Sequence, residues 1–410
     1  MADININIIK EISGRYGDAF YLLDMERFRN NFIELQKSMC GYYKNSFIAY
    51  SYKTNYIPKI CKMVNELGGY AEIVSEMELE IAKKSGVELN KIIFNGPYKD
   101  VKSVCELLFN GGIVNVDSVY DFNIIEEIAK NYSYKRFSIG IRCNFDISDG
   151  IVSRFGFDIN GDEFFYVLNR IKELPNCELL GYHCHFASRN LEHWKNKVKG
   201  MIDIIENYYP YVPKYVCFGG GIFGKMDESL KSQFNCYIPS YQEYAEVIAK
   251  GFADKFNSLD REKQPMMFIE PGSALSADTM KFVSKIMGIK NIKGKNIATL
   301  LGSVYNINPT LNGKNPPIEI ISENSGYREF YNDLDMGGYT CIESDYLYKG
   351  FNGNLEVGDY AVFGNIGSYS IVLKPPFILP NFPILEIVDN KIIEVKRGEV
   401  FDDLFRTYIF

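Results

Sequence analysis

Several residue types and patterns that mark particular protein classes are scarce in this sequence. Histidine occurs three times and tryptophan once in 410 residues. The nine cysteines form no CxxC pair and no zinc-type spacing, which favours reduced thiols over a disulfide scaffold or a zinc site. No stretch approaches the roughly 20 uncharged apolar residues of a membrane span, and the first residues carry acids without a long apolar core. We therefore expect a cytoplasmic protein that does not act at a membrane.

The charge balance narrows the partners further. The net charge is -7, and no basic block offsets it. Because phosphate backbones and anionic lipids attract clustered lysine and arginine, neither nucleic acid nor a membrane surface is an expected partner. Hydrophobic residues make up 46% of the chain, which is enough for a substantial core.

Short apolar runs alternate with amphipathic stretches from residue 47 to residue 270, a pattern typical of parallel βα units. Eight runs predict strands, and seven helical stretches lie between them, which favours a (β/α)₈ TIM-type barrel over an open doubly wound sheet. The predicted strands are residues 47–53, 69–74, 92–95, 113–117, 137–143, 179–185, 215–219 and 266–270.

The pattern changes after residue 275, where β-type runs separated by Gly, Asn and Asp predict a mainly β C-terminal domain. One predicted hairpin turns at Asp389 and Asn390. The run at 19–24 precedes the barrel repeat and could pair with this second domain. The expected organisation is an N-terminal strand segment at 1–25, a barrel at 26–275 and a β-rich domain at 276–410.

Unusual polar residues fall where the predicted barrel strands end, which is where barrel enzymes gather their reactive groups. Lys53 ends the first strand; it is either an interior amine suited to covalent chemistry or a lysine that reaches solvent. His183 and His185 alternate on the sixth strand, but no third ligand with metal-like spacing follows, so no metal is expected. His185 could instead lie flat against a planar cofactor, or simply be satisfied by backbone.

Glycine and acid residues follow the last two strands. Gly219, Gly220 and Gly221 could bind an anion through backbone N–H groups, or form only a tight turn. Glu270 precedes Pro-Gly and could pair with a protonated ring nitrogen or cap a helix. Ser188 offers a further hydroxyl for a phosphate.

Taken together, these segments resemble the fold-type III decarboxylases that use pyridoxal 5′-phosphate (PLP), the group of diaminopimelate and ornithine decarboxylases. The resemblance spans residues 17–400. It rests on YSYKTN (50–55), AEIVSEMEL (71–79), IRCNFD (141–146), SRFGF (153–157), GYHCHFAS (181–188), FGGGIFG (218–224), EPGS (270–273), TCIESD (340–345) and GDYAVFGNIGSY (358–369).

The resemblance implies a role for each matching residue. Lys53 would carry PLP, His185 would stack on its ring, and Glu270 would pair with the ring nitrogen. Cys341, with Asp345 close by, would reach into the site of a partner subunit and donate a proton, which implies a homodimer with shared active sites. The remaining positions implied to hold or surround the cofactor are Glu72, Arg142, Ser188, Gly219, Gly220, Gly221, Gly272 and Tyr369.

Three departures from the diaminopimelate decarboxylase pattern bear on the substrate. Ser273 stands where those enzymes have the arginine of EPGR. Asn308 and Asn312 stand at the arginine and tyrosine of an Arg-Pro-x-x-Tyr segment, and the cysteine motif places Glu343 one residue later than expected. Loss of two arginines removes the bidentate donors for a distal carboxylate.

We therefore expect a small amino-acid-type substrate, or an amino-acid conjugate, in a natural-product, siderophore or microcin-like pathway. Arg189 is a cation that could contact a different acidic group or lie at the surface, and Glu343 or Asp345 could bind the distal amine of lysine or ornithine. The alternatives are a diaminopimelate decarboxylase of lysine biosynthesis, an amino-acid racemase and a non-catalytic homologue.

Overall fold

The computed structural model describes residues 4–208 and 212–410, which divide into two compact units. The barrel unit comprises Asn30–Phe223 and Tyr237–Ala274, and the β-rich unit comprises residues 4–29, Gly224–Cys236 and Leu275–Phe410. The expected barrel range of 26–275 differs mainly at Gly224–Cys236, which groups with the β-rich unit, as do residues 26–29 and Leu275 at its two ends. This segment follows the glycine turn and carries only the short helix α9 (Glu228–Lys231), so neither strand nor helix periodicity marked it. Each unit is described by itself.

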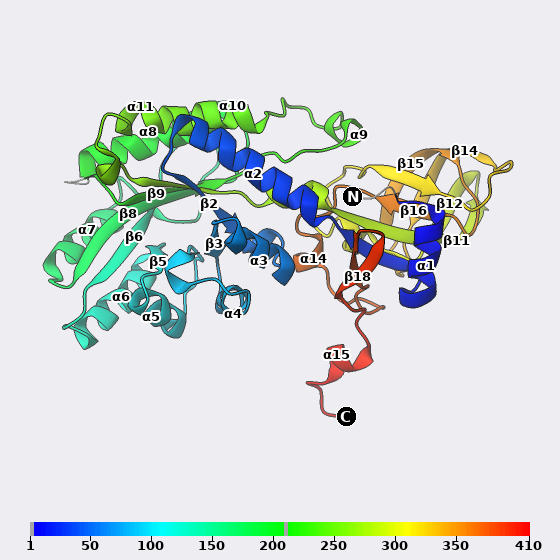
Figure 1. The fold of residues 1–410 in the computed structure, drawn as a ribbon, viewed down its shortest axis with the longest axis horizontal. Coiled ribbons are helices and arrows are strands. Elements are labelled where there is room, and N and C mark those ends of the chain that lie inside the picture. The colour runs from blue at the N-terminus through cyan, green and yellow to red at the C-terminus, as the bar shows by residue number, and fades with distance from the viewer. Residues whose placement is uncertain (1–3, 209–211) are drawn as a thin grey trace. The chain divides into compact units, whose positions relative to one another are not determined.

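The barrel unit is a closed ring of eight parallel strands, as predicted. Figure 1 shows strands of this unit between helices that lie on the outside. Pairing of β5 with β6 closes the ring, and the two-residue strand β7 (Phe157–Asp158) pairs with β6 outside it. The ring strands are β2 (Ser46–Ser51), β3 (Tyr70–Ile73), β4 (Ile92–Phe94), β5 (Ile113–Val116), β6 (Phe137–Asn144), β8 (Cys177–Phe186), β9 (Tyr215–Gly220) and β10 (Met266–Glu270).

Helices connect consecutive ring strands, and several of them follow a residue whose side chain caps the helix N-terminus. Ser75, Asp100 and Ser118 each accept a hydrogen bond from a backbone N–H of the first helical turn, which satisfies a donor left free at a helix start. The helices are α3 (Pro58–Glu66), α4 (Glu76–Lys84), α5 (Val101–Phe109), α6 (Val119–Asn131), α7 (Asp162–Glu173), α8 (Leu191–Tyr208), α10 (Tyr241–Ala245) and α11 (Gly251–Phe256), with α2 (Met25–Tyr42) before β2.

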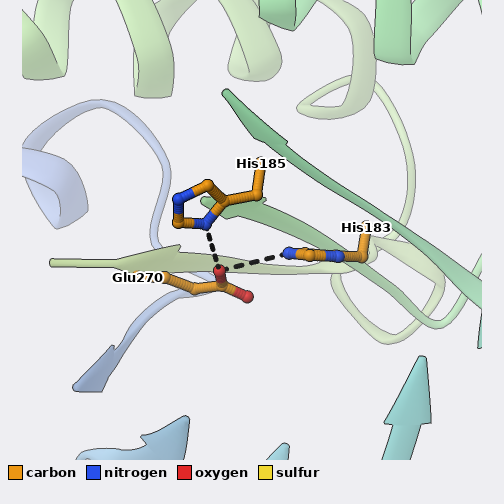
Figure 2. Close-up of side chains that lie close together, drawn as sticks. All are labelled: His183, His185 and Glu270. Carbon is orange, nitrogen blue, oxygen red and sulfur yellow. Dashed lines mark hydrogen bonds and ion pairs between the residues drawn. The ribbon is translucent and has the colours of Figure 1, made fainter. Parts of the chain in front are cut away.

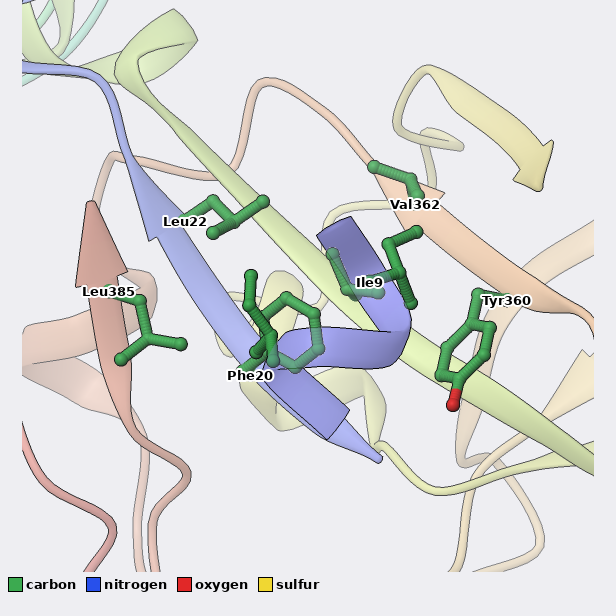
Figure 3. Packing of buried hydrophobic residues seen from close by; sticks show 8 residues of the cluster. Ile9, Phe20, Leu22, Tyr360, Val362 and Leu385 are labelled. Atoms are coloured by element: carbon green, nitrogen blue, oxygen red, sulfur yellow. The ribbon is translucent and has the colours of Figure 1, made fainter. Parts of the chain in front are cut away.

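The β-rich unit is a mixed sheet that includes the first strand of the chain. Strand β1 (Ala19–Leu23) pairs antiparallel with β11 (Met280–Ile292) and parallel with β17 (Ile384–Val388). Against this sheet packs α1 (Ile6–Tyr16), which buries Ile9 and Ile12 in a core shared with the strands (Figure 3). The other strands are β12 (Lys295–Leu300), β13 (Ile318–Ile321), β14 (Phe330–Gly337), β15 (Tyr346–Asn354), β16 (Tyr360–Phe363) and β18 (Lys391–Lys396).

The predicted hairpin at Asp389 and Asn390 is confirmed. It joins β17 to β18, and both turn residues have positive φ, 49° and 60°, as a two-residue hairpin turn requires. The other described helices of the unit are short: α9, α13 (Val304–Ile307), α14 (Ser370–Leu373) and α15 (Phe401–Phe405), with α12 (Ser273–Ser276) at the boundary between the two units. Across the described part of the chain, no helix combines the length and the apolar character needed to cross a membrane.

Candidate functional site

Lys53 lies just beyond the first ring strand. Strand β2 ends at Ser51, so Lys53 stands in the 3-10 turn Tyr52–Thr54 and not within the strand predicted at 47–53. Its Nζ donates to Glu72 Oε2 at 2.5 Å, and Ser51 Oγ donates to the same oxygen at 2.6 Å. Burial acts to raise the pKa of Glu72, but the Lys53 charge and the hydrogen bonds from Lys53 and Ser51 together outweigh it and hold the pKa below its usual range. The buried Glu72 therefore balances the lysine as a carboxylate.

Glu270, the last residue of β10, is the meeting point of a second cluster (Figure 2). Its Oε2 lies 3.2 Å from His183 Nε2 and 3.6 Å from His185 Nδ1, while Asn95 Nδ2 donates to Oε1 at 2.7 Å. Burial lowers the pKa of His185 to about 3, and it lowers the pKa of His183 as well, so both rings are neutral. Burial also raises the pKa of Glu270, with the Glu72 charge adding to the effect.

These pKa directions describe a carboxylate that lacks a cation. Neutral histidines cannot supply one, and Lys53 is hydrogen-bonded to Glu72. A protonated ring nitrogen beside Glu270 would supply the missing positive charge, which is the contact that a PLP ring offers. The half-exposed His185 ring would then be available to stack on that cofactor.

A chain of amides links the two acids, and the sequence analysis missed it. Asn95 Nδ2 lies 3.3 Å from Glu72 Oε1 as well as contacting Glu270, and Asn115 Nδ2 donates to Asn95 Oδ1 at 2.7 Å. Tyr215 donates to Asn115 in turn. The available signal was Asn95 at the end of one apolar strand and Asn115 inside the next, since a polar residue in a buried strand needs a partner.

Glycines allow the Glu270, His185 and Thr54 side chains to pack directly against the backbone. A Cβ at Gly219 would lie 2.4 Å from both Glu270 Oε2 and His185 Nδ1, and a Cβ at Gly272 would lie 2.0 Å from Thr54 Oγ1. Neither position tolerates a larger residue without displacing the acid, the ring or the lysine turn.

The expected phosphate region is also assembled within the barrel unit. Ser188 Oγ lies 2.6 Å from His193 Nδ1, and a Cβ at Gly221 would lie 2.4 Å from Arg189 Cγ. The Arg189 guanidinium stands 4.9 Å from the centre of the Phe223 ring. Gly220 has a φ of 136°, which strongly favours glycine. The serine, the glycine turn and a cation thus gather at the ends of β8 and β9.

Arg142 lies next to His183 in the register of β6 with β8, and its side chain pairs with an acid of the neighbouring strand connection. Its Nη1 donates to Asp117 Oδ1 at 2.8 Å, and both side chains are buried. It therefore supports the loop after β5 and is not hydrogen-bonded to His185 or Glu270. Lys99 and Asp121 form a second buried pair, at 2.7 Å, beside it.

The other implied residues belong to the β-rich unit. Cys341 and Glu343 are exposed, and Tyr369 has a left-handed backbone with a φ of 64°. Asp345 is only 4% exposed, and its carboxylate accepts hydrogen bonds from Ser303 Oγ, from the backbone N–H of Val304, and from both the N–H and the hydroxyl of Thr340. The expectation that Asp345 binds a distal amine is therefore corrected, since its acceptors are occupied within its own unit.

The departures from the family pattern form their own local structure. Asn308 Nδ2 donates to the backbone carbonyl of Asn312, and Asn312 Nδ2 donates to Asn308 Oδ1. Thr310 Oγ1 also donates to Asn308 Oδ1, so this segment holds itself together by side-chain bonds. Ser273 begins α12 and is half-buried.

One cluster in the barrel also has the donor set of a metal site. The nearest ligand atoms of His183, His185 and Glu270 all lie within 4.8 Å of one another. The adjacent Lys53–Glu72 pair has no role in such a site, whereas an amine beside a buried acid fits PLP. The donor chemistry around Glu270 therefore fits the cofactor.

Comparisons with known proteins agree with this geometry. Residues 26–277 match the family model described as "Pyridoxal-dependent decarboxylase, pyridoxal binding domain". Similar proteins include a diaminopimelate decarboxylase of Aquifex aeolicus, 26% identical over 96% of this chain and 92% of the relative, and a probable chloroplastic diaminopimelate decarboxylase of rice, 24% identical over 95% and 79%.

Solved structures share the fold over almost the whole chain. A diaminopimelate decarboxylase from M. jannaschii aligns with a TM-score of 0.86 at 21% identity, covering 98% of this chain and 94% of the other. The arginine decarboxylase of Paramecium bursaria Chlorella virus aligns with a TM-score of 0.76 at 19% identity, covering 93% and 98%. The chain belongs to the pyridoxal-dependent decarboxylase family, and it is a carboxy-lyase that uses PLP.

Proposed function

We propose that this protein removes the α-carboxylate of an amino acid as CO₂, with meso-diaminopimelate as the first candidate substrate. The observation that supports this reaction is a pair of buried acids at one end of the barrel. Glu72 is paired with Lys53, and Glu270 contacts neutral histidines. The candidate substrate comes from the relatives. They are named diaminopimelate decarboxylases, and this chain aligns with nearly their full length. These names favour lysine-type metabolism over the natural-product pathway expected from the sequence.

The residues of the barrel have separate tasks in this proposal. Bound PLP supplies an electron sink for the charge left when CO₂ departs. Lys53 holds the cofactor covalently through its amine, and Glu72 holds that amine in place. Glu270 keeps a proton on the ring nitrogen, because a buried carboxylate without another cation favours a protonated neighbour. Asn95 orients both acids by donating to each.

We further propose that the protein acts as a homodimer in which Cys341 serves the partner's site as proton donor. An exposed thiol on the β-rich unit is free to do so. Glu343, also exposed, is the remaining acid in this motif that could meet a distal amine, because Asp345 is occupied.

A second candidate substrate is an amino acid or conjugate whose distal group lacks a carboxylate. The observation in its favour is that Ser273 and Asn308 replace two arginines, and that Asn308 is engaged with Asn312. A truncated charge-assisted contact typically costs about 1.5–3 kcal/mol, or roughly 10–150-fold in affinity.

The test is CO₂ release from the purified protein with meso-diaminopimelate, lysine, ornithine and arginine, each at several concentrations. We expect turnover of meso-diaminopimelate to exceed that of the other three. Preference for a substrate without a distal carboxylate would favour the second candidate. Absence of CO₂ release from every amino acid, with PLP bound, would contradict the decarboxylase proposal for free amino acids.

A further inference from the structure

Lys197, in the second turn of α8, is a buried cation that the proposed chemistry does not use. Its side chain has no exposed surface. Its Nζ donates to the backbone carbonyls of Phe186 at 2.9 Å and Ser188 at 3.2 Å. Among the described residues, no carboxylate lies within ion-pair distance of it. A buried ammonium without an anion is costly, so its presence calls for a reason.

The position of this amine provides one. A Cβ at Gly220 would lie 2.5 Å from Lys197 Nζ, so the amine lies directly against the glycine turn after β9. The two carbonyls that it contacts flank Ala187, in the segment after β8 that carries Ser188. Lys197 therefore joins the two segments from which the sequence implies phosphate contacts.

The surroundings of Lys197 allow a nearby anion to raise its pKa. Asp149 and the Cys184 thiol act on it only from a distance, and they only partly offset the burial that lowers the pKa of Lys197 to about 7. Trp194, whose ring centre lies 3.8 Å from Nζ, favours the charged form. Four further ionisable groups lie against the turn or beside Ser188: Glu270 and His185 at Gly219, Arg189 at Gly221, and His193 at Ser188. A phosphate at the turn would therefore favour the charged lysine.

We propose that Lys197 is a positioning residue that stabilises the phosphate group of PLP from behind the glycine turn. It supplies positive charge to an anion held by backbone N–H groups, and it fixes the carbonyl groups beside Ser188 so that this segment keeps its place. The proposal concerns cofactor binding, so it does not depend on which substrate the enzyme uses.

The test compares PLP with pyridoxal, which has the same ring and aldehyde but no phosphate. The cofactor is removed from the full-length protein, and the affinity for each ligand is measured by absorbance titration. In Lys197→Met we expect PLP affinity to fall about tenfold or more, while pyridoxal affinity changes little. Lys197→Arg should keep most of the preference for PLP, because it keeps the charge.

Two further variants separate charge from structural support. Lys197→Gln retains a donor for the carbonyls but no charge, and it replaces Lys197→Met if that variant does not fold. Lys199→Met removes an exposed lysine of the same helix and should leave both affinities unchanged. Equal losses for PLP and pyridoxal, or a Lys197→Gln protein with the original PLP preference, would overturn the proposal. Binding of neither ligand by the unmodified protein would overturn it together with the cofactor assignment.

Discussion

The barrel mouth and the loops of the β-rich unit hold their polar residues in different ways. At the barrel mouth Glu72, Asn95 and Glu270 are at most 4% exposed, and each bonds to side chains from other strands. In the β-rich unit Cys341 and Glu343 are exposed, and Asn308 bonds within its own segment. The first arrangement links many elements, whereas the second links few.

This difference explains why the departures at Asn308, Asn312 and the cysteine motif fall in the loops of the β-rich unit. Removing a partner from a buried network leaves an unsatisfied charge or amide, at a cost of about 1–3 kcal/mol or more. Replacing a residue in an exposed loop leaves its neighbours solvated, so loops tolerate change and carry specificity. The barrel should therefore preserve cofactor chemistry while the loops determine the substrate.

The largest expected effect is at Lys53. Lys53→Ala removes the amine proposed to hold the cofactor, so decarboxylation should fall below detection and borohydride should no longer fix cofactor to the protein. Lys62→Ala, an exposed lysine on α3, is the matched control and should remain active and yellow. If Lys53→Ala protein retained both covalent cofactor and activity, this result would contradict the proposal that Lys53 binds PLP.

Glu270→Gln should have the next largest effect. The amide keeps the size of the side chain but loses the charge that retains the ring proton, so kcat should fall about 10²–10³-fold. The control is Glu178→Gln, the same change near the start of β8, whereas Glu270 is the last residue of β10. Equal activity of Glu270→Gln and the unmodified enzyme would show that the ring proton does not depend on this acid.

Glu270→Gln should also change how the stability of the cofactor-free protein depends on pH. Burial raises the pKa of Glu270 in the folded protein without cofactor above its unfolded value. The resulting stabilisation is present at low pH and is lost as pH rises through the folded pKa. Urea unfolding of the cofactor-free protein should show stability decreasing over this range, and Glu270→Gln should weaken that dependence. An identical pH dependence in the variant would contradict the raised pKa.

Cys341→Ala tests whether the β-rich unit contributes to the chemistry or only to specificity. We expect turnover to fall on the order of 10²-fold with cofactor binding intact, since a lost general acid slows proton transfer. Mixing Lys53→Ala with Cys341→Ala protein should restore part of the activity if the site is shared. Cys236→Ala, at another exposed cysteine, is the control. Failure of rescue after confirmed subunit exchange would contradict a shared site.

The barrel was predictable because its strands are continuous apolar runs bounded by helical periodicity. All eight predicted strands are confirmed, with ends that shift by at most two residues. Lys53 was assigned to the strand because a 3-10 turn after a buried run has no periodic signal of its own. The hairpin at Asp389 and Asn390 was predictable because few residues accept positive φ at both turn positions.

Side-chain partners were harder to predict than strands. The family resemblance implied that Arg142 lies near the site, but not that it bonds to Asp117, because that contact depends on the strand register between β5 and β6. Asp345 was expected to be available to a ligand, yet its carboxylate caps the start of α13 at Ser303 and Val304. These contacts join residues 25 and 42 positions apart, which no local pattern reveals.

The smallest expected effect is at Arg189. Its substitution tests how far the barrel contributes to substrate specificity. If meso-diaminopimelate is the substrate, its distal carboxylate needs a cation in place of the two missing arginines, and Arg189 has no acidic partner among the described residues. Arg189→Met should then raise KM for meso-diaminopimelate roughly tenfold with kcat nearly unchanged, because the lost contact is equal in ground and transition states. Arg136→Met, at the opposite end of the barrel, should leave KM unchanged. An unaltered KM in Arg189→Met would assign distal recognition to the β-rich unit alone, and a parallel loss of PLP but not pyridoxal affinity would assign Arg189 to the phosphate instead.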